Sequence, residues 1–507
     1  MVQGRVLVVA GSDSSGGAGL EADQKVIAAH GCYAMTATTA LTAQNTRGVR
    51  DIHHVPVAFV REAMEACLED VGVDVVKTGM LASADVIEMV ATVLVKHGIN
   101  KVVVDPVMIS TSGATLLPND AITNLTTHLL PHTTLLTPNI PEAKLILTTS
   151  GVDPGEIRSA ADLETLGRRI QALGPAWVLV KGGHLPFRRR DMAVAEGKGE
   201  REVVVDVLVG PGERDVFRVE GPWQETSSTH GTGCSLASAI ASGLAKGLPV
   251  PDAVRSACRY VEAAIRTAPG LGGGHGPLNH FHSTYALPFS PGYFVEYLLS
   301  RPDVKDVWRQ FVHHPFVLAM GDGTLPLESF KGYIIQDYRF LIQFARANAL
   351  VAYKSNNMTD ISRATQLVGH IMTETNLHVK YCQSFNITLA EMQATEEHQA
   401  YTRYVLDVGQ SEDLTALQIA LAPCLLGYLA AAEMLRDHPD TVREGNRYWA
   451  WIENYIAEDY TESVRLGSEL LEKAAVLQSP SRIEELVKIF VHATKMEIGF
   501  WEMFPHK

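Results

Sequence analysis

The sequence predicts two units of different fold class: an α/β unit with a mostly parallel sheet flanked by helices, followed by an all-α unit. The chain has 507 residues, which is more than one hydrophobic core usually organises. Up to about residue 270, short β-branched runs alternate with helical patterns. From residue 292 onward, apolar residues recur at helical spacing and no strand pattern is convincing.

Five runs rich in β-branched and apolar residues are the predicted strands of the first unit. They are residues 5–10, 75–79, 101–105, 134–137 and 177–181. Strands that alternate with helices form βαβ units, in which the sheet is mostly parallel and helices cover both of its faces. We expect this unit to occupy residues 1–287.

A break between the units is predicted at residues 288–291. Pro288, Pro291 and Gly292 lie within five positions and disfavour both helix and strand. We therefore expect a linker at 288–291 and an all-helical unit at 292–507, each unit with its own core.

The composition restricts the possible functions. The net charge of −14 argues against a protein that binds nucleic acid without sequence preference through a basic face. The six cysteines include no C-x-x-C pair, which favours reduced thiols over a disulfide framework or a zinc site. We find no signal-peptide pattern and no run of about 18 apolar residues. We expect a cytoplasmic protein with no nucleic-acid and no membrane partner.

Two glycine-rich turns are the first candidate binding elements. Residues 11–19 follow the first predicted strand, and their glycines allow close approach of backbone N–H groups to a ligand. They match neither a P-loop nor a clean dinucleotide fingerprint, so a simple tight turn is equally consistent. Residues 230–234, His-Gly-Thr-Gly-Cys, lead into a helix of small residues and are typical of an anion hole for a phosphoryl group.

Cys234 ends the second turn at the predicted start of that helix. The helix dipole is expected to favour its thiolate, which makes Cys234 a candidate base or hydrogen-bond partner for a substrate hydroxyl. A buried cysteine that caps a turn is the alternative.

Charged residues at three other strand ends indicate a nucleotide and metal site. Asp105 and Lys181 end predicted strands, and Glu142 follows another. In an open α/β sheet, ligands bind beyond the carboxyl ends of the strands. Asp105 and Glu142 can hold Mg²⁺ directly or through water, and Lys181 can bind a nucleotide phosphate.

Residues 1 to about 285 resemble the hydroxymethylpyrimidine/phosphomethylpyrimidine kinases of the ribokinase-like superfamily. The motifs that carry the resemblance are 10–19, 43–49, 77–81, 181–184 and 230–234. Sugar kinases of this superfamily carry aspartate where this chain has Cys234, which points to the vitamin-kinase branch.

The resemblance implies ATP-dependent, Mg²⁺-dependent phosphorylation of a hydroxymethylpyrimidine and its monophosphate, with Cys234 near the attacking oxygen. The implied ATP-binding residues are Asn139, Lys181, Gly231, Thr232 and Gly233, and the implied metal ligands are Asp105 and Glu142. The implied pyrimidine-binding residues are Gly11, Asp23, Gln44, Met80 and Val107. Pyridoxal, another flat heteroaromatic hydroxymethyl compound, is the alternative substrate.

Polar residues also fall on apolar stripes of predicted helices in the second unit. Asp337, Cys424 and Glu497 each share a helix face with large apolar side chains. A buried acid needs hydrogen bonds, a raised pKa or a polar ligand, although each residue alone is also consistent with a satisfied core position. Tyr401 and Tyr455 can stack on a flat heterocycle, which favours a pocket.

A dinuclear metal site is the alternative for the second unit. Glu374 and His378 have the spacing of two ligands on one helix face. No second carboxylate and histidine set accompanies them, so metal chemistry is disfavoured.

Residues from about 292 to 507 resemble the TenA/thiaminase II family, whose fold is like that of heme oxygenase. The motifs are 335–338, 421–428, 451–455 and 497–501. The resemblance implies that Cys424 adds to a pyrimidine ring and that Glu497 transfers a proton at a ring nitrogen. The implied substrate-binding residues are Asp337, Phe340, Tyr401, Tyr428, Tyr455 and Phe500. Phe340 stands where the family often has tyrosine.

Together the two resemblances imply a bifunctional thiamine-biosynthesis fusion. An aminopyrimidine aminohydrolase (thiaminase II) would release the pyrimidine that the kinase phosphorylates, so small pyrimidines and thiamine are the expected partners of a homo-oligomer. The alternative is a pyridoxal-type vitamin kinase joined to a non-catalytic helical oligomerisation module. The presence of both Cys424 and Glu497 disfavours that alternative.

Overall fold

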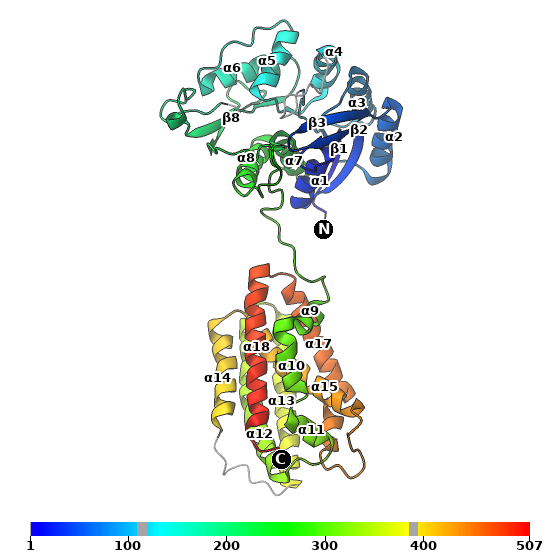
Figure 1. The fold of residues 1–507 in the computed structure, drawn as a ribbon, viewed down its shortest axis with the longest axis vertical. Coiled ribbons are helices and arrows are strands. Elements are labelled where there is room, and N and C mark those ends of the chain that lie inside the picture. The colour runs from blue at the N-terminus through cyan, green and yellow to red at the C-terminus, as the bar shows by residue number, and fades with distance from the viewer. Residues whose placement is uncertain (1, 109–118, 184, 385–393, 507) are drawn as a thin grey trace. The chain divides into compact units, whose positions relative to one another are not determined.

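The computed structural model forms two compact units, Met1–Thr284 and Tyr285–Lys507 (Figure 1). It describes residues 2–108, 119–183, 185–384 and 394–506. His184 and the side chains of Glu374 and His378 lie outside the described residues.

The first unit is built on a nine-stranded sheet with the order β3-β2-β1-β4-β5-β6-β7-β8-β9. The strands are β1 Arg5–Asp13, β2 Tyr33–Asn45, β3 Gly48–His54, β4 Val75–Thr78, β5 Val102–Val104, β6 Leu135–Leu136, β7 Trp177–Val180, β8 Val203–Val209 and β9 Val216–Pro222. Neighbours from β2 to β7 pair in parallel, and β3, β8 and β9 pair antiparallel. The predicted mostly parallel sheet is confirmed, with its five predicted strands at the centre.

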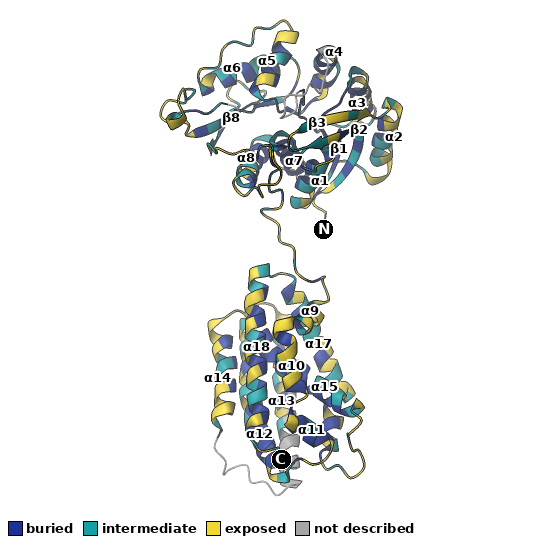
Figure 2. Cartoon of the chain, viewed as in Figure 1, coloured by how far each residue is buried: buried dark blue, intermediate teal, exposed yellow. Residues whose placement is uncertain are grey.

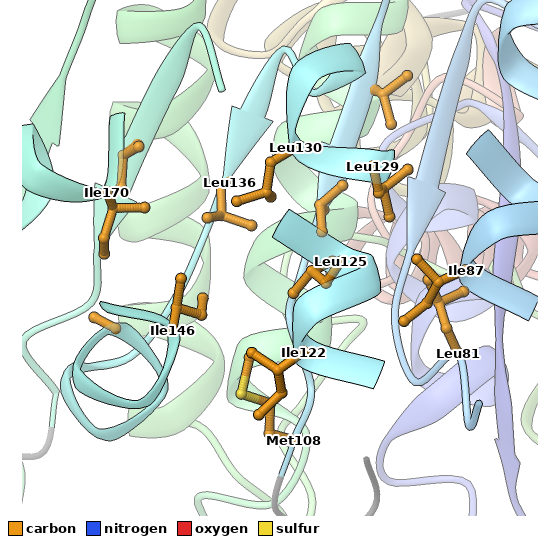
Figure 3. Close-up of a cluster of buried hydrophobic side chains, with 14 of the residues drawn as sticks. Leu81, Ile87, Met108, Ile122, Leu125, Leu129, Leu130, Leu136, Ile146 and Ile170 are labelled. Atoms are coloured by element: carbon orange, nitrogen blue, oxygen red, sulfur yellow. The ribbon is translucent and has the colours of Figure 1, made fainter. Parts of the chain in front are cut away.

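Helices cover both faces of this sheet. They are α1 Gly19–Ala29, α2 Val57–Ala66, α3 Ala84–Lys96, α4 Asn119–Asn124, α5 Ile140–Thr149, α6 Ala160–Gln171, α7 Thr232–Ala245 and α8 Val250–Arg266. Successive strand side chains point to opposite faces, so Leu7 and Val9 pack under α2 to α6 while Val6 and Val8 pack under α1, α7 and α8. On the face covered by α2 to α6, Leu136 of β6 lies among apolar side chains of the neighbouring helices (Figure 3).

The second unit is built from helices joined by loops, with no strand among its described residues. Its helices are α9 Phe294–Ser300, α10 Pro302–Val312, α11 Pro315–Gly321, α12 Leu327–Lys354, α13 Met358–Ser384, α14 Glu396–Ser411, α15 Leu414–Asp437, α16 Trp449–Tyr455, α17 Glu458–Ala475 and α18 Pro480–Glu502. Buried residues follow the inward stripes of these helices (Figure 2). The core is aromatic, with Trp501 stacked on Phe311 and Phe316.

Helix α15 is the most apolar long helix of the second unit. By length and composition it is the one described helix that could cross a membrane, but 56% of its most apolar window is buried among neighbouring helices. Core helices of water-soluble bundles have this character as well, so the composition of α15 is explained by packing.

The segment before α9 packs on the helical core. Phe289, inside the predicted linker, is 9% exposed, and its ring lies 5.1 Å from that of Phe294 and 5.4 Å from that of Tyr297. The helical core therefore begins upstream of residue 292. The predicted end of the first unit at residue 287 stays a prediction.

We expect fragments 1–287 and 285–507 each to unfold cooperatively, because each has its own core. Fragment 290–507 lacks Phe289 and should be less stable than 285–507 by about 1.5–3 kcal/mol, the usual value for burying one large apolar side chain. Urea unfolding followed by circular dichroism measures the difference. Equal midpoints for the two helical fragments would show that Phe289 contributes nothing to the core.

Candidate functional sites

A cavity of about 650 Å³ lies at the carboxyl ends of the parallel strands in the first unit. All but one of the residues predicted for the kinase site line it. They are Gly11, Gln44, Met80, Asp105, Val107, Asn139, Glu142, Lys181, Gly231, Thr232, Gly233 and Cys234. The parallel register explains this convergence, because strands that run the same way end at the same edge of the sheet.

The two glycine-rich turns meet at one wall of the cavity. Gly231 has a φ of 79°, and a Cβ there would lie 2.0 Å from the carbonyl oxygen of Gly17. Both the left-handed backbone and the close approach therefore require glycine. A Cβ on Gly233 would lie 3.1 Å from Lys181 Nζ and 3.4 Å from Asp105 Oδ2. The missing side chain leaves a cradle beside a cation at a helix start, which fits a nucleotide phosphate.

Asp105, Glu142 and Lys181 form a charged group beside this cradle. Lys181 Nζ donates to Asp105 Oδ1 at 2.8 Å. Burial, opposed by the Lys181 ammonium, raises the pKa of Glu142 to about 7. Among the described residues, no three acidic, histidine or cysteine side chains are arranged to hold a metal alone. Mg²⁺ commonly takes one or two carboxylates together with phosphates and water, and Asp105 and Glu142 fit that requirement.

Glu142 also caps the start of helix α5. Its carboxylate accepts from the N–H of Asn139 at 2.8 Å, and the Asn139 side chain accepts from the N–H of Glu142 at 2.8 Å. This reciprocal pair is a capping box, which fixes both predicted residues at the cavity wall.

The expectation that the helix start favours the Cys234 thiolate is wrong. Cys234 is the third residue of α7, but burial raises the pKa of its thiol to about 12, against the opposing effect of Lys77. Desolvation of the charged sulfur outweighs the helix dipole. Cys234 therefore faces the cavity as a neutral thiol at physiological pH, able to hydrogen-bond but not to act as a ready base.

Asp23 is the exception among the predicted residues, because it does not line the cavity. It is fully buried, and each of its carboxylate oxygens accepts from Lys77 Nζ at 2.9 Å. The hydroxyl of Ser238 donates to the same carboxylate at 2.7 Å. Lys77, which sequence reasoning missed as a site residue, forms the cavity wall instead.

Asp13 and His230 are two further cavity residues that sequence reasoning missed, although both lie in the quoted motifs. His230 Nε2 lies 2.8 Å from Asp13 Oδ2, and the Gln44 amide lies 3.3 Å from the same ring nitrogen. Asp13 also accepts from Ser15 and from the N–H groups of Gly17 and Ala18. Burial would raise the pKa of Asp13, but these bonds lower it to about 2.

Apolar residues from β9 and α8 line the cavity as well, among them Val219, Val261 and Ile265. A flat base can pack against such side chains. In the sequence, the helical spacing of Cys258, Val261 and Ile265 could have indicated a cavity-lining stripe. The same spacing is equally typical of a stripe that faces the core.

The second unit brings Glu497, Tyr401 and Tyr428 together from three helices. Glu497, on α18, is 1% exposed. Tyr401 of α14 donates to its Oε1 at 2.6 Å, and Tyr428 of α15 donates to Oε2 at 3.4 Å. Burial raises the pKa of Glu497 to about 8, although the Tyr401 hydrogen bond opposes the rise. Glu497 is thus largely protonated at neutral pH.

Asp337 of α12 and Cys424 of α15 belong to the same cluster. Burial raises the pKa of Asp337 to about 7, and its carboxylate acts electrostatically on Glu497 and Tyr428. Burial, Glu497 and Cys424 together raise the pKa of Tyr401. The acids, tyrosines and thiol predicted from separate helices therefore share one low-dielectric site.

Aromatic rings enclose this cluster. Phe340 stacks on Tyr401 at 5.1 Å and lies edge-on to Phe500 at 5.9 Å, while Tyr455 lies 5.1 Å from Tyr428. Phe340 fills the ring position that stacking needs and supplies no hydroxyl. Sequence reasoning missed Tyr333, whose hydroxyl accepts from Trp451 Nε1 at 3.2 Å. Tyr333 lies one turn before Asp337, on the same stripe.

We expect Lys77→Met to destabilise the first unit by about 3–5 kcal/mol, because it leaves the Asp23 carboxylate buried without a cation. Adding Asp23→Asn should recover part of this loss, since the amide is neutral and keeps a partner in Ser238. Urea-dependent hydrogen exchange in β1 and β4 of the full chain reports both changes. A loss below 1 kcal/mol for Lys77→Met would show that the pair does not hold a charge on Asp23.

Comparisons with known proteins cover both units. The family model for phosphomethylpyrimidine kinase matches residues 13–279, and the TENA/THI-4/PQQC family model matches residues 301–506. A putative hydroxymethylpyrimidine/phosphomethylpyrimidine kinase 2 of Schizosaccharomyces pombe is 41% identical over 98% of this chain and 90% of its own length. The Saccharomyces cerevisiae hydroxymethylpyrimidine/phosphomethylpyrimidine kinase THI20 is 33% identical over 98% of this chain and 94% of its own.

A bacterial relative has the same two regions within a longer chain. The thiamine biosynthesis multifunctional protein ThiED of Corynebacterium glutamicum is 31% identical over 98% of this chain and 67% of its own length. Both parts of this sequence thus have counterparts together in single relatives. The chain belongs to the phosphomethylpyrimidine kinase family, as a two-part member whose second part is of the TENA/THI-4/PQQC family.

Proposed function

We propose that the first unit transfers the γ-phosphoryl group of ATP to hydroxymethylpyrimidine and then to its monophosphate. The second unit hydrolyses aminopyrimidine and thiamine and so releases hydroxymethylpyrimidine. The observation that supports the kinase most directly is the cradle at Gly233, where the missing Cβ leaves room for a phosphate against Lys181. Together the two activities recycle the pyrimidine half of thiamine.

In the kinase, the substrate hydroxyl oxygen attacks the γ-phosphorus, the bond to ADP breaks, and ADP leaves with the bond electrons. The hydroxyl proton passes to a phosphate oxygen or to solvent as the new bond forms. The N–H groups at the start of α7 and the ammonium of Lys181 stabilise the charge that spreads over the phosphoryl oxygens. The Cys234 thiol is neutral, so it orients the hydroxyl instead of removing its proton early. This is sufficient because phosphoryl transfer depends mainly on positioning and charge stabilisation.

The nucleotide and its metal have a place in the same cavity. Val219, Val261 and Ile265 would hold the base, and the turn at Gly231 would bind the phosphates. Asp105 and Glu142 would hold Mg²⁺, which would neutralise charge on the phosphates.

In the hydrolase, the Cys424 sulfur adds to the pyrimidine ring while Glu497 gives its proton to a ring nitrogen and receives the thiol proton. The leaving group on the methylene departs with the electrons of its bond, and water adds in its place, giving one proton to the leaving group or to solvent. The sulfur is then expelled as the ring nitrogen returns its proton. Glu497 is suited to this exchange because burial keeps it protonated near neutral pH. Asp337 orients the aminopyrimidine between the rings of Phe340, Phe500 and Tyr455.

The proposal also covers the compartment and the oligomeric state of the protein. We propose that the protein acts in the cytoplasm, where small pyrimidines and ATP are available, and that it forms a homo-oligomer. Pyridoxal phosphorylation is the second candidate for the first unit, and direct competition between pyridoxal and hydroxymethylpyrimidine separates the two.

Lys181→Ala should lower kinase turnover by about 100-fold or more, since it removes a cation that stabilises the transferring phosphoryl group. Cys234→Ala should lower it less, because the thiol is a neutral hydrogen-bond partner. ADP release with hydroxymethylpyrimidine measures both, and hydrolysis by the unchanged helical unit serves as an internal control. Full kinase rates in both variants would remove the assignment of this site.

Cys424→Ser should lose hydrolysis by orders of magnitude while staying folded, because a hydroxyl is a far weaker nucleophile at neutral pH. Wild-type kcat/KM should fall as the pH rises through about 8, where Glu497 loses the proton that it must donate. Glu497→Gln should be slow and should lack this alkaline decline.

Aminopyrimidine and thiamine hydrolysis, measured from pH 6 to 9.5 with and without a chelator, tests these expectations. Substantial turnover by Cys424→Ser would end the covalent mechanism. Loss of wild-type activity on chelation would instead favour a metal site.

A further inference from the structure

The hydrogen bonds around Gln44 determine which way its amide points in the kinase cavity. Gln44 lies beside two buried groups: its Nε2 position is 3.3 Å from His230 Nε2, and its Oε1 position is 3.1 Å from Thr42 Oγ1. A half-turn of the amide exchanges these two positions. The donors and acceptors nearby decide between the two orientations.

His230 requires an acceptor on its side of the amide. Asp13 Oδ2 lies 2.8 Å from His230 Nε2 and already accepts from the N–H groups of Gly17 and Ala18. An ionised carboxylate has no hydrogen to give, so His230 Nε2 must carry the hydrogen. A nitrogen that carries a hydrogen has no lone pair for a second donor. The amide oxygen of Gln44 therefore belongs on the His230 side, where it shares this N–H with Asp13.

Thr42 requires a donor on the other side of the amide, for an independent reason. Its hydroxyl lies 2.8 Å from the carbonyl oxygen of Ser12, which can only accept. The single hydroxyl hydrogen is thus directed at Ser12, and the Thr42 oxygen is left as an acceptor. The Gln44 nitrogen can donate to it. Both neighbours select the same orientation.

We propose that His230 and Thr42 hold the Gln44 amide with its oxygen on the His230 side and its nitrogen on the Thr42 side, and that this fixed polarity selects a 4-aminopyrimidine edge. Asp13 acts through His230, and Ser12 through Thr42, so all four are positioning residues for Gln44. The proposal rests on the proposed kinase function and names what makes that site specific.

The chemistry of the substrate edge explains the selection. A 4-aminopyrimidine offers an amine donor next to a ring-nitrogen acceptor, which matches one amide oxygen and one amide N–H. The hydroxymethyl group must face the turn at Gly231 for phosphorylation, so the ring has one productive direction. A 4-oxo analogue has the reversed order, a carbonyl acceptor next to a ring N–H donor. If the Gln44 amide is fixed, the carbonyl of this analogue faces the amide oxygen, and its ring N–H faces the amide N–H.

The test compares phosphorylation of the 4-amino compound and its 4-oxo analogue by the full chain with ATP. The wild type should prefer the amino compound in kcat/KM by about 100-fold or more. His230→Leu and Thr42→Val each release one side of the amide, and each should reduce this preference at least tenfold. His230→Gln and Thr42→Ser keep the donor and the hydroxyl, and should restore most of it. His275 lies beside the turn at Gly231, with its Nδ1 3.4 Å from Thr229 Oγ1, and His275→Leu should leave the preference unchanged.

The ratio separates positioning from structural damage, because a loss of folded protein or of a general contact lowers both rates equally. An unchanged ratio in both His230→Leu and Thr42→Val overturns the proposal, and so does a wild type that accepts both compounds equally. Thr42→Val decides the matter if His230→Leu does not fold. A wild type that phosphorylates neither pyrimidine overturns the proposed kinase function itself.

Discussion

The close approach of two glycine-rich loops is the constraint on which the kinase cavity depends. No side chain fits between Gly231 and the Gly17 carbonyl, and a Cβ on Gly17 would lie 2.6 Å from the His230 ring. Asp13 joins both loops, because its carboxylate binds N–H groups of its own loop and the imidazole of the other. The strand ends that carry Asp105 and Lys181 then face a wall whose backbone is already fixed.

The buried acid in the helical unit is stabilised differently from the buried charges in the first unit. Around Lys77 and Lys181, buried charges are retained because each lysine has a carboxylate at hydrogen-bond distance. Around Glu497, the described neighbours include tyrosine hydroxyls, and burial favours the neutral acid. One chain therefore contains a site organised around full charges, suited to anionic phosphates, and a site organised around exchangeable protons, suited to a neutral heterocycle.

Much of this arrangement was predictable from residue order, for identifiable reasons. The central strands are buried on both faces and read as continuous apolar runs. Edge strand β3 is polar and half exposed, and β2 mixes alanine with threonine, so neither stood out. Asp105 and Lys181 line the cavity as expected, because the end of a strand fixes where a residue lies. Asp23 does not line the cavity, because an inward-facing helix stripe does not show whether a residue meets a cavity or a buried partner such as Lys77. The local dipole rule failed at Cys234 because burial depends on residues distant in sequence.

The capping box at Glu142 links ligand chemistry to helix order. The carboxylate that we propose as a metal ligand also accepts from the N–H of Asn139, and the Asn139 side chain in turn caps the first turn of α5. A proton or a cation that withdraws electron density from this oxygen weakens the capping hydrogen bond. By linkage, breaking the cap changes the affinity for the proton or cation by the same factor by which binding changes the stability of the cap. Loss of catalysis on replacing Glu142 would therefore combine two physical effects. Thermodynamic coupling at one carboxylate makes the beginning of α5 a part of the active centre.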